Sequence, residues 1–190
     1  MREAQRSEKS KIINILTNSF LGNKSIDYLI PNDSDRIVRI EELMSYSFEL
    51  CFESGKVYIS DDGHGCALIS FPDKKKFTVR GLIREARLVL LSLGLRNALK
   101  AMKREKAISK HYANTPIYYL WFIGVQPDFQ DQGIGGRLLS EVLLDAEVLN
   151  RKVYLETSTL RNIGWYERFG LRIYHELDFG YRLFLISSEK

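Results

Sequence analysis

The sequence has few cysteines, no long hydrophobic run and only a mild net charge. Its two cysteines, Cys51 and Cys66, are not spaced as a CxxC pair, which argues against a disulfide framework or a zinc site and favours two small buried side chains. The longest strongly apolar run, Leu88 to Leu95, is far shorter than the ~20 residues that a membrane span needs. Because the opening MREAQRSEKSK also lacks an apolar signal core, we expect a cytoplasmic protein without a membrane partner.

The composition is that of a soluble globular protein, with 45% hydrophobic and 27% charged residues. Internal repeats, low-complexity tracts and linkers are also missing, so we expect a single domain over residues 1–190.

The net charge of +4 is unevenly distributed along the chain. Between residues 80 and 112, nine basic residues stand against Glu85 and Glu105, a local excess of 9 − 2 = +7. This segment either faces an anionic ligand or surface, or is a solvated helix face, and we favour the second interpretation. Nucleic-acid binding is not expected, although steeply salt-dependent affinity would reveal it.

Hydrophobic periodicity predicts an α+β (mixed α/β) chain. The predicted helices cover residues 8–20, a stretch capped by Asp33 and Ser34 that ends at Gly55, residues 77–112 with a break at Gly94, the stretch after the glycine loop to about residue 150, and residues 161–170. The predicted strands cover residues 56–60, 66–71, 117–125, 152–158, 171–179 and 181–187, with the apolar strand 117–125 lying centrally in the sheet.

The stretch VQPDFQDQGIGGRLL places three glycines between that central strand and the next helix. Such an arrangement presents backbone N–H groups and a helix dipole to an anion, and glycine lets the ligand approach closely. No Lys-Ser or Lys-Thr follows the glycines, which excludes the GxxxxGK[ST] loop of NTPases. Leu138 stands where the dinucleotide motif GxGxxG needs glycine.

The remaining match is the pattern [QR]xxGx[GA], filled by Gln130, Gly133 and Gly135, with Asn162, Tyr166 and Gly170 downstream. In these residues the sequence resembles the GNAT superfamily of acyl-CoA-dependent N-acyltransferases. The residues before the glycine loop (WFIGV) and before the last helix (ETS) are most similar to the small-molecule branch that includes the puromycin acetyltransferase type. The resemblance implies a GNAT fold, with a mixed, mostly antiparallel sheet of six to seven strands flanked by helices, whose first strand is short or missing here.

The resemblance also implies acetyl-CoA as cosubstrate. The main chain of the central strand would hold the pantetheine arm and polarise the thioester, and the glycine loop would hold the pyrophosphate. The implied cofactor-binding residues are Ile123, Gly124, Val125, Gln130, Asp131, Gln132, Gly133, Ile134, Gly135, Gly136, Arg137, Asn162 and Tyr166.

Two residues are candidates for proton transfer. Tyr166 is the candidate general acid, because a phenol stays protonated at neutral pH and can donate to the leaving thiolate. The alternative is that Tyr166 only packs with Trp165 and Phe169. Glu156 is the candidate base, and the alternative is an exposed strand glutamate or a partner of a nearby arginine.

The acceptor is expected to be a small-molecule amine. Tyr119 and Trp121 share one face of the central strand, opposite Tyr118, Leu120 and Phe122, and either line an acceptor pocket or pack in the core. A protein or peptide acceptor, or a non-catalytic CoA-binding module, stays open as an alternative, as does a homodimer. The three histidines have no ligand spacing, so no metal is expected.

Overall fold

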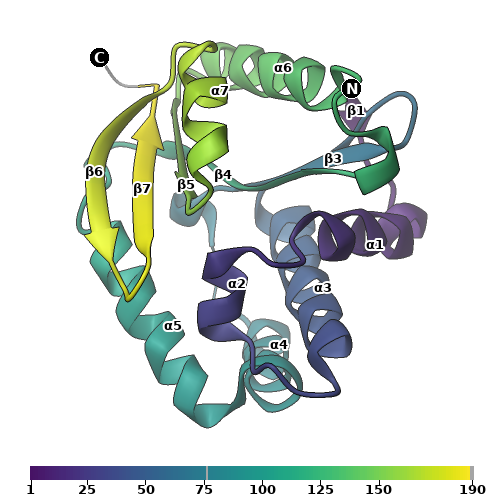
Figure 1. The fold of residues 1–190 in the computed structure, drawn as a ribbon, viewed down its shortest axis with the longest axis vertical. Helices are drawn as coiled ribbons and strands as arrows, with labels where there is room; N and C mark the ends of the chain where they lie inside the picture. Colours follow the sequence, from purple (N-terminus) through teal and green to yellow (C-terminus); the bar gives the residue numbers. More distant parts are fainter. Residues whose placement is uncertain (76, 189–190) are drawn as a thin grey trace.

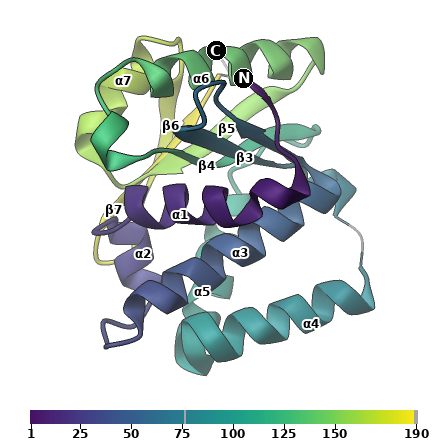
Figure 2. The same cartoon turned by 90° about the vertical axis from the view of Figure 1, so that its right-hand side faces the viewer.

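The computed structural model describes residues 1–75 and 77–188, which form one seven-stranded sheet between layers of helices. The strand order is β1-β2-β3-β4-β5-β7-β6, and every neighbouring pair is antiparallel except β4 and β5. Helices α6 and α7 cover one face of the sheet, and α1 and α3 cover the other (Figures 1 and 2). The predicted α+β class and sheet are thereby confirmed.

The elements follow the predicted order apart from helix α2, and the first strand is present but short. The strands are β1 (Arg2–Glu3), β2 (Lys56–Ile59), β3 (Gly65–Ser70), β4 (Ile117–Val125), β5 (Lys152–Thr157), β6 (Arg172–Asp178) and β7 (Arg182–Ser187). The helices are α1 (Lys9–Ser19), α2 (Lys24–Leu29), α3 (Arg36–Ser54), α4 (Val79–Leu88), α5 (Gly94–Ser109), α6 (Ile134–Val148) and α7 (Ile163–Glu167). None of the helices in the described part of the chain is long and apolar enough to cross a membrane.

The N-terminal third differs from the prediction at two places. Helix α2 was not predicted; Asn23 starts it, because its side-chain oxygen accepts hydrogen bonds from Ser25 N (2.9 Å) and Ile26 N (3.4 Å). Helix α3 begins after Asp35, not directly after Asp33 and Ser34. Asp33 instead accepts a 3.1 Å hydrogen bond from the amide of Asp35, which folds the turn before the helix.

The core has two main parts, one on each face of the sheet. Helices α1 and α3 pack against one face through fully buried side chains such as Ile12, Met44 and Phe48. Helices α6 and α7 pack against the other face through Leu139, Val142 and others. Cys51 and Cys66 are buried free thiols, as predicted, and burial raises the pKa of each thiol.

Strand β4 contains an irregularity that changes which side chains share a face. Leu68 pairs with Phe122 and Ile69 with Leu120, so Trp121 is an extra residue at a β-bulge. After the bulge the alternation is reversed: Phe122 packs with the α1 and α3 core, whereas Leu120 packs on the α6 face. The prediction that Phe122 shares the face of Tyr118 and Leu120 was therefore wrong, because it assumed unbroken alternation.

Between β3 and β4 the chain forms the helices of the basic segment. Helix α4 continues through a π-helical turn (Val89–Leu93) into α5, and the chain bends at Gly94, whose φ of +73° favours glycine. The predicted break at Gly94 is confirmed.

Candidate active site

The sheet opens where β4 and β5 diverge. Their parallel pairing covers only Ile117–Tyr119 opposite Lys152–Tyr154. Beyond this point β4 stays paired with β3 as far as Val125, while β5 pairs with β7. The edge of β4 from Leu120 to Val125 that faces β5 therefore has no strand partner among the described residues. This edge contains the predicted pantetheine-binding residues Ile123, Gly124 and Val125.

The glycine loop ends this strand with its amides exposed. Asp131 and Gly133 have φ values of +59° and +78°, and Gly133 is the N-cap of α6 without a side-chain hydrogen bond to the helix. Within the described residues, the backbone N–H groups from Gln132 to Gly136 donate no hydrogen bond. These unpaired donors, with the helix dipole behind them, fit an anionic group such as a pyrophosphate.

The side chain of Gln130 ties the loop to the end of β4. Gln130 Nε2 donates to the carbonyl oxygen of Val125 at 3.1 Å, and Ser19 Oγ lies 2.8 Å from the same oxygen. Arg137 is exposed, with long contacts of 3.4 Å to Asp62 and to the carbonyl oxygen of Gln132. Arg137 is therefore free to turn toward an anion over the helix N-terminus.

Helix α7 lies directly beside the loop. A Cβ added to Gly135 would lie 3.7 Å from the Trp165 ring, and one added to Gly136 would lie 3.5 Å from Phe169. The short helix thereby brings Asn162 and Tyr166 next to the loop. Asn162 is half-buried, and its side chain makes no hydrogen bond to another described residue.

Tyr166 is buried on the α6 face with Leu155 and Trp165. Burial raises the pKa of its phenol, so it stays protonated at neutral pH. Its hydroxyl makes no hydrogen bond to a described residue. Tyr166 also packs against Trp165, with 4.8 Å between ring centroids, as the alternative interpretation expected. This packing leaves the hydroxyl free to donate a hydrogen bond.

Glu156 lies on the opposite face of the sheet. Its carboxylate accepts hydrogen bonds from Tyr119 (2.6 Å) and Tyr112 (3.2 Å). Burial raises the pKa of Glu156, although Arg104 and these hydrogen bonds act against the shift. Neighbouring Leu155 faces the other side, as the strand alternation predicts. Glu156 and Tyr166 thus flank the opening from opposite faces.

Arg104 and Tyr112 were not predicted as site residues. Arg104 Nε donates to the hydroxyl of Tyr181 at 3.2 Å, and its charge acts on Glu156 without an ion pair within 4.0 Å. The signal in the sequence is helical spacing: Ile108 is the buried residue of α5, and Arg104 and Tyr112 lie four residues to either side. The net charge of the segment does not distinguish Arg104, which lies near Glu156, from the exposed basic residues around it.

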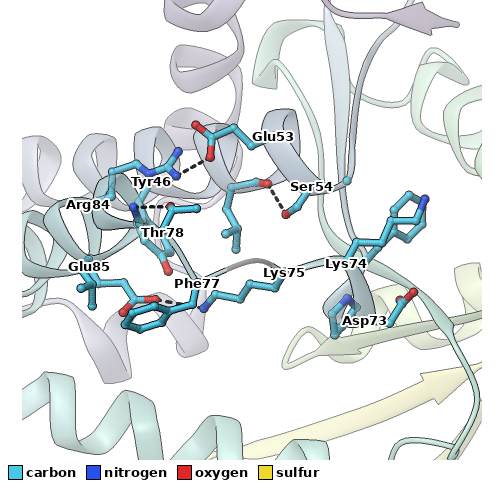
Figure 3. A pocket seen from close by; sticks show the side chains of 16 residues that line it. Tyr46, Glu53, Ser54, Asp73, Lys74, Lys75, Phe77, Thr78, Arg84 and Glu85 are labelled. Atoms are coloured by element: carbon cyan, nitrogen blue, oxygen red, sulfur yellow. Dashed lines mark hydrogen bonds and ion pairs between the residues drawn. The ribbon is translucent and has the colours of Figure 1, made fainter.

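The predicted acceptor residues lie together near Glu156. Trp121 stacks on Tyr119, with 6.4 Å between ring centroids, and meets the ring of Tyr46 edge-on at 6.3 Å. Tyr46 in turn lines a cavity of about 900 Å³ between α3, α4 and residues 71–75 and 77–78 (Figure 3). The cavity wall carries the ion pairs Arg84–Glu53 and Lys75–Glu85. No residue of the glycine loop lines this cavity, and Tyr46 is a lining residue that also contacts Trp121.

The structure brings together two histidines that are far apart in sequence. The rings of His111 and His175 stack at 3.8 Å between centroids, and burial lowers the pKa of His111. Within residues 1–75 and 77–188, no group of three or more His, Cys, Asp or Glu side chains is placed to hold a metal ion. The expectation of a metal-free site stays a prediction.

Comparisons with known proteins bear on this geometry. Residues 100–172 match the family model described as an acetyltransferase (GNAT) domain. Among curated proteins, a probable serine/threonine-protein kinase of Dictyostelium discoideum is 29% identical over 94 residues, covering 45% of this chain and 10% of that protein. The chain thus spans about a tenth of the length of that relative.

Solved structures share the whole fold. A protein described as histone acetyltransferase HPA2 and related acetyltransferase, from Corynebacterium glutamicum, has a TM-score of 0.74 at 18% identity, covering 98% of this chain and 93% of that chain. The C-terminal condensation domain of Ebony has a TM-score of 0.75 at 11% identity, covering 100% and 97%. Arylalkylamine N-acetyltransferase 2 from Aedes aegypti has a TM-score of 0.64 at 12% identity, covering 98% and 95%.

The family match covers β4, the glycine loop, α6, β5 and α7, which are the elements that build the opening and the unpaired amides. The surrounding sheet and helices have the fold of the solved structures. Residues 100–172 therefore resemble a GNAT acetyltransferase domain, and the whole chain shares the fold of these solved structures.

Proposed function

We propose that this chain is an enzyme that transfers an acetyl group from acetyl-CoA to the amine of a small molecule, directly within a ternary complex. The opening between β4 and β5 carries this proposal. At one end of it lie the unpaired amides of the glycine loop, and on its two faces lie a protonated phenol and a buried carboxylate.

Acetyl-CoA would lie along the free edge of β4. Its pyrophosphate would rest on the amides from Gln132 to Gly136, with Arg137 beside it. Its pantetheine arm would follow the backbone of Ile123, Gly124 and Val125, as an added strand does. Asn162 and Tyr166 would contact the arm from α7.

Starting from the ammonium, the reaction removes two protons from the nitrogen and supplies one proton to the thiolate. Glu156 would take a proton from the acceptor ammonium, so that the neutral nitrogen can attack the thioester carbonyl. Collapse of the tetrahedral intermediate breaks the carbon–sulfur bond, and Tyr166 would give its proton to the leaving thiolate. The second proton, which the nitrogen loses as the amide forms, would restore the phenol. Positioning of the two substrates supplies much of the remaining rate.

The acceptor side favours a small amine. Tyr119, Trp121 and Tyr112 surround the carboxylate with aromatic surface, which suits an apolar or flat amine. Solved structures with this fold include an arylalkylamine and a polyamine N-acetyltransferase, in keeping with such an acceptor. The basic excess of residues 80–112 opposes a lysine-rich protein tail as acceptor.

The direct test is to measure thiol release from acetyl-CoA with a panel of arylalkylamines, polyamines and amino-terminal peptides, alongside calorimetric binding of acetyl-CoA. We expect binding, and turnover on at least one small amine. Binding with no turnover on any amine would favour a non-catalytic CoA-binding module. Turnover on peptides alone would favour a protein acceptor.

The glycine loop can be tested without disturbing the fold. A Cβ at Gly135 would meet Val125 and Trp165 at ordinary contact distances of 3.6 and 3.7 Å, so Gly135→Ala is a tolerated control. We expect Gly135→Val, whose branched side chain extends further into this space, to abolish acetyl-CoA binding while thermal unfolding stays close to that of Gly135→Ala. Unchanged affinity in the valine variant would contradict the proposed pyrophosphate site.

A further inference from the structure

The inserted helices expose an unusual amount of apolar surface. Among the described residues, nine of the eighteen exposed large hydrophobic side chains lie between Phe77 and Met102. Leu90, Leu95 and Met102 are 70%, 76% and 68% exposed. We use the name apolar ridge for seven of these residues: Val79, Ile83, Leu90, Leu91, Leu95, Leu99 and Met102. A soluble chain rarely leaves so large a group uncovered without a partner.

Helical spacing places the α5 residues of the ridge on one face of that helix. In α5, Leu95, Leu99 and Met102 follow each other at intervals of four and three residues and share one face. The opposite face carries Ile108, which is fully buried. Helix α4 contains no buried residue at all, although its apolar and charged side chains are strongly segregated.

Exposed cations accompany the ridge. Arg80, Arg96, Lys103, Lys106 and Lys110 are all exposed, and within the described residues none of them forms an ion pair. By contrast, Arg84 and Arg87 pair with Glu53 and Glu42 of α3. The surface around the ridge is therefore positive, because Glu105 is the one exposed acid on α5.

The bend between α4 and α5 lies at one end of the long axis of the molecule, away from α6 and α7 (Figures 1 and 2). Leu90, Leu91 and Leu95 belong to this bend. These three exposed side chains thus lie at an end of the protein, where a broad flat surface can reach them.

We propose that the apolar ridge and its cations bind the surface of an anionic membrane. Exposed apolar side chains enter the interface between headgroups and acyl chains, while the basic residues attract anionic headgroups. The proposal departs from the expectation of no membrane partner, which rested on the missing membrane span. This binding mode needs no span, since an amphipathic helix lies in the plane of the interface.

Charge and polarity favour an anionic membrane over two other partners, a second copy of the chain and a nucleic acid. In a twofold dimer the same surface meets itself, so the unpaired cations would be brought together without compensating acids. Nucleic acid would suit the cations but not the exposed leucines, because its accessible surface is dominated by phosphates. An anionic lipid surface satisfies both kinds of side chain.

The test is sedimentation of the full chain with vesicles of phosphatidylcholine alone and with vesicles that also contain phosphatidylserine, at low and high salt. We expect the chain to bind the phosphatidylserine vesicles at least tenfold more strongly, and salt to weaken that binding. Reversing two cations in the variant Arg96→Glu with Lys103→Glu should lower the partition by about 25-fold or more, at about fivefold for each basic residue.

The apolar part is tested by Leu95→Ser with Leu99→Ser, which should also abolish binding. The matched control is Leu144→Ser with Val148→Ser on α6, whose side chains are 60% and 83% exposed on a different helix, and which should bind as the unchanged chain does. Thermal unfolding checks that each variant is folded.

Three results would overturn the proposal. One is no binding to phosphatidylserine vesicles at low salt. Another is an equal loss in the α6 control. The third is a dimer in analytical ultracentrifugation that only the Leu95→Ser, Leu99→Ser variant disperses, without vesicle binding, because the ridge would then join two copies. These outcomes are independent of acetyl transfer, which is assayed with soluble substrates.

Discussion

Two carboxylates on opposite faces of the sheet have similar tyrosine partners and opposite electrostatics. On the α6 face, Asp145 accepts hydrogen bonds from Tyr118 (2.8 Å) and Tyr58 (2.9 Å). On the other face, Glu156 accepts from Tyr119 (2.6 Å) and Tyr112 (3.2 Å). Tyr118 and Tyr119 are consecutive residues of β4, and consecutive side chains of a strand point to opposite faces of the sheet. One strand therefore supplies a phenol to each carboxylate.

The two carboxylates differ in that only Asp145 has a cation in direct contact among the described residues. Lys56 Nζ lies 2.7 Å from Asp145. Burial alone would raise the pKa of Asp145, but Lys56 and the two phenols lower it. Glu156 has Arg104 nearby without an ion pair, and burial raises its pKa. The first carboxylate is fixed as a charged anchor, whereas burial raises the pKa of the second, which suits the proposed role of a base.

Removing the charge of Glu156 is expected to have the largest effect. Glu156→Gln keeps the size of the side chain and an acceptor for the phenols but removes the base, so turnover should fall by about 100-fold or more. Steady-state kinetics measure this, with Asp145→Asn as control, whose folded fraction should turn over within about twofold of the unchanged chain. Equal losses in both variants would mean that the two carboxylates have the same role.

Tyr166 provides a second comparison, within the α6 face. Its hydroxyl makes no hydrogen bond to a described residue, whereas that of Tyr58 donates to Asp145. Tyr166→Phe should lower kcat by about tenfold to 100-fold with little change in acetyl-CoA affinity or thermal unfolding. Tyr58→Phe should lower the thermal stability and leave kcat unchanged. If kcat in Tyr166→Phe is nearly normal, water or another group protonates the thiolate.

Local patterns in the sequence predicted much of the fold. The apolar strand, the glycine loop and Gly94 are features of neighbouring residues, so the order of elements and the bend in the inserted helices could be read directly. The bulge at Trp121 could not, because it depends on how β4 pairs with β3. One extra residue there decides which face receives Phe122.

The residues of the proposed site could be named from the sequence where they form a motif. The loop from Gln130 to Arg137 was identified by its glycines. Arg104 and Tyr112 reach Glu156 only through the packing of α5 against the sheet, across more than forty residues of chain. A charge count treats Arg104 like the exposed Arg96, although one points to the site and the other to solvent.

The comparison also predicts opposite responses of stability to pH. The pKa of Asp145 is lowered on folding, so its contribution is present above its unfolded value and is lost as pH falls. Asp145→Asn should lower the free energy of unfolding by about 1.5–3 kcal/mol at pH 7, and by less at acidic pH.

The pKa of Glu156 is raised on folding, so its ionisation opposes folding as pH rises. Glu156→Gln should therefore be neutral or stabilising at pH 7. Urea unfolding at several pH values measures both; a large loss of stability in Glu156→Gln at pH 7 would contradict this assignment.

The smallest expected effect concerns the pH at which Glu156 acts. The positive charge of Arg104 holds the pKa of Glu156 below the value that burial alone would give. Arg104→Met should therefore shift the acid limb of kcat/KM to higher pH, with a loss of roughly threefold at the low-pH end and almost none at high pH, as expected for one charge interaction outside contact distance. Arg104→Lys should restore the limb, and Arg96→Met on the exposed face of α5 should leave it in place. A uniform loss at every pH in Arg104→Met would instead assign this arginine a role in packing against Tyr181, because only a change in the pKa of Glu156 makes the loss depend on pH.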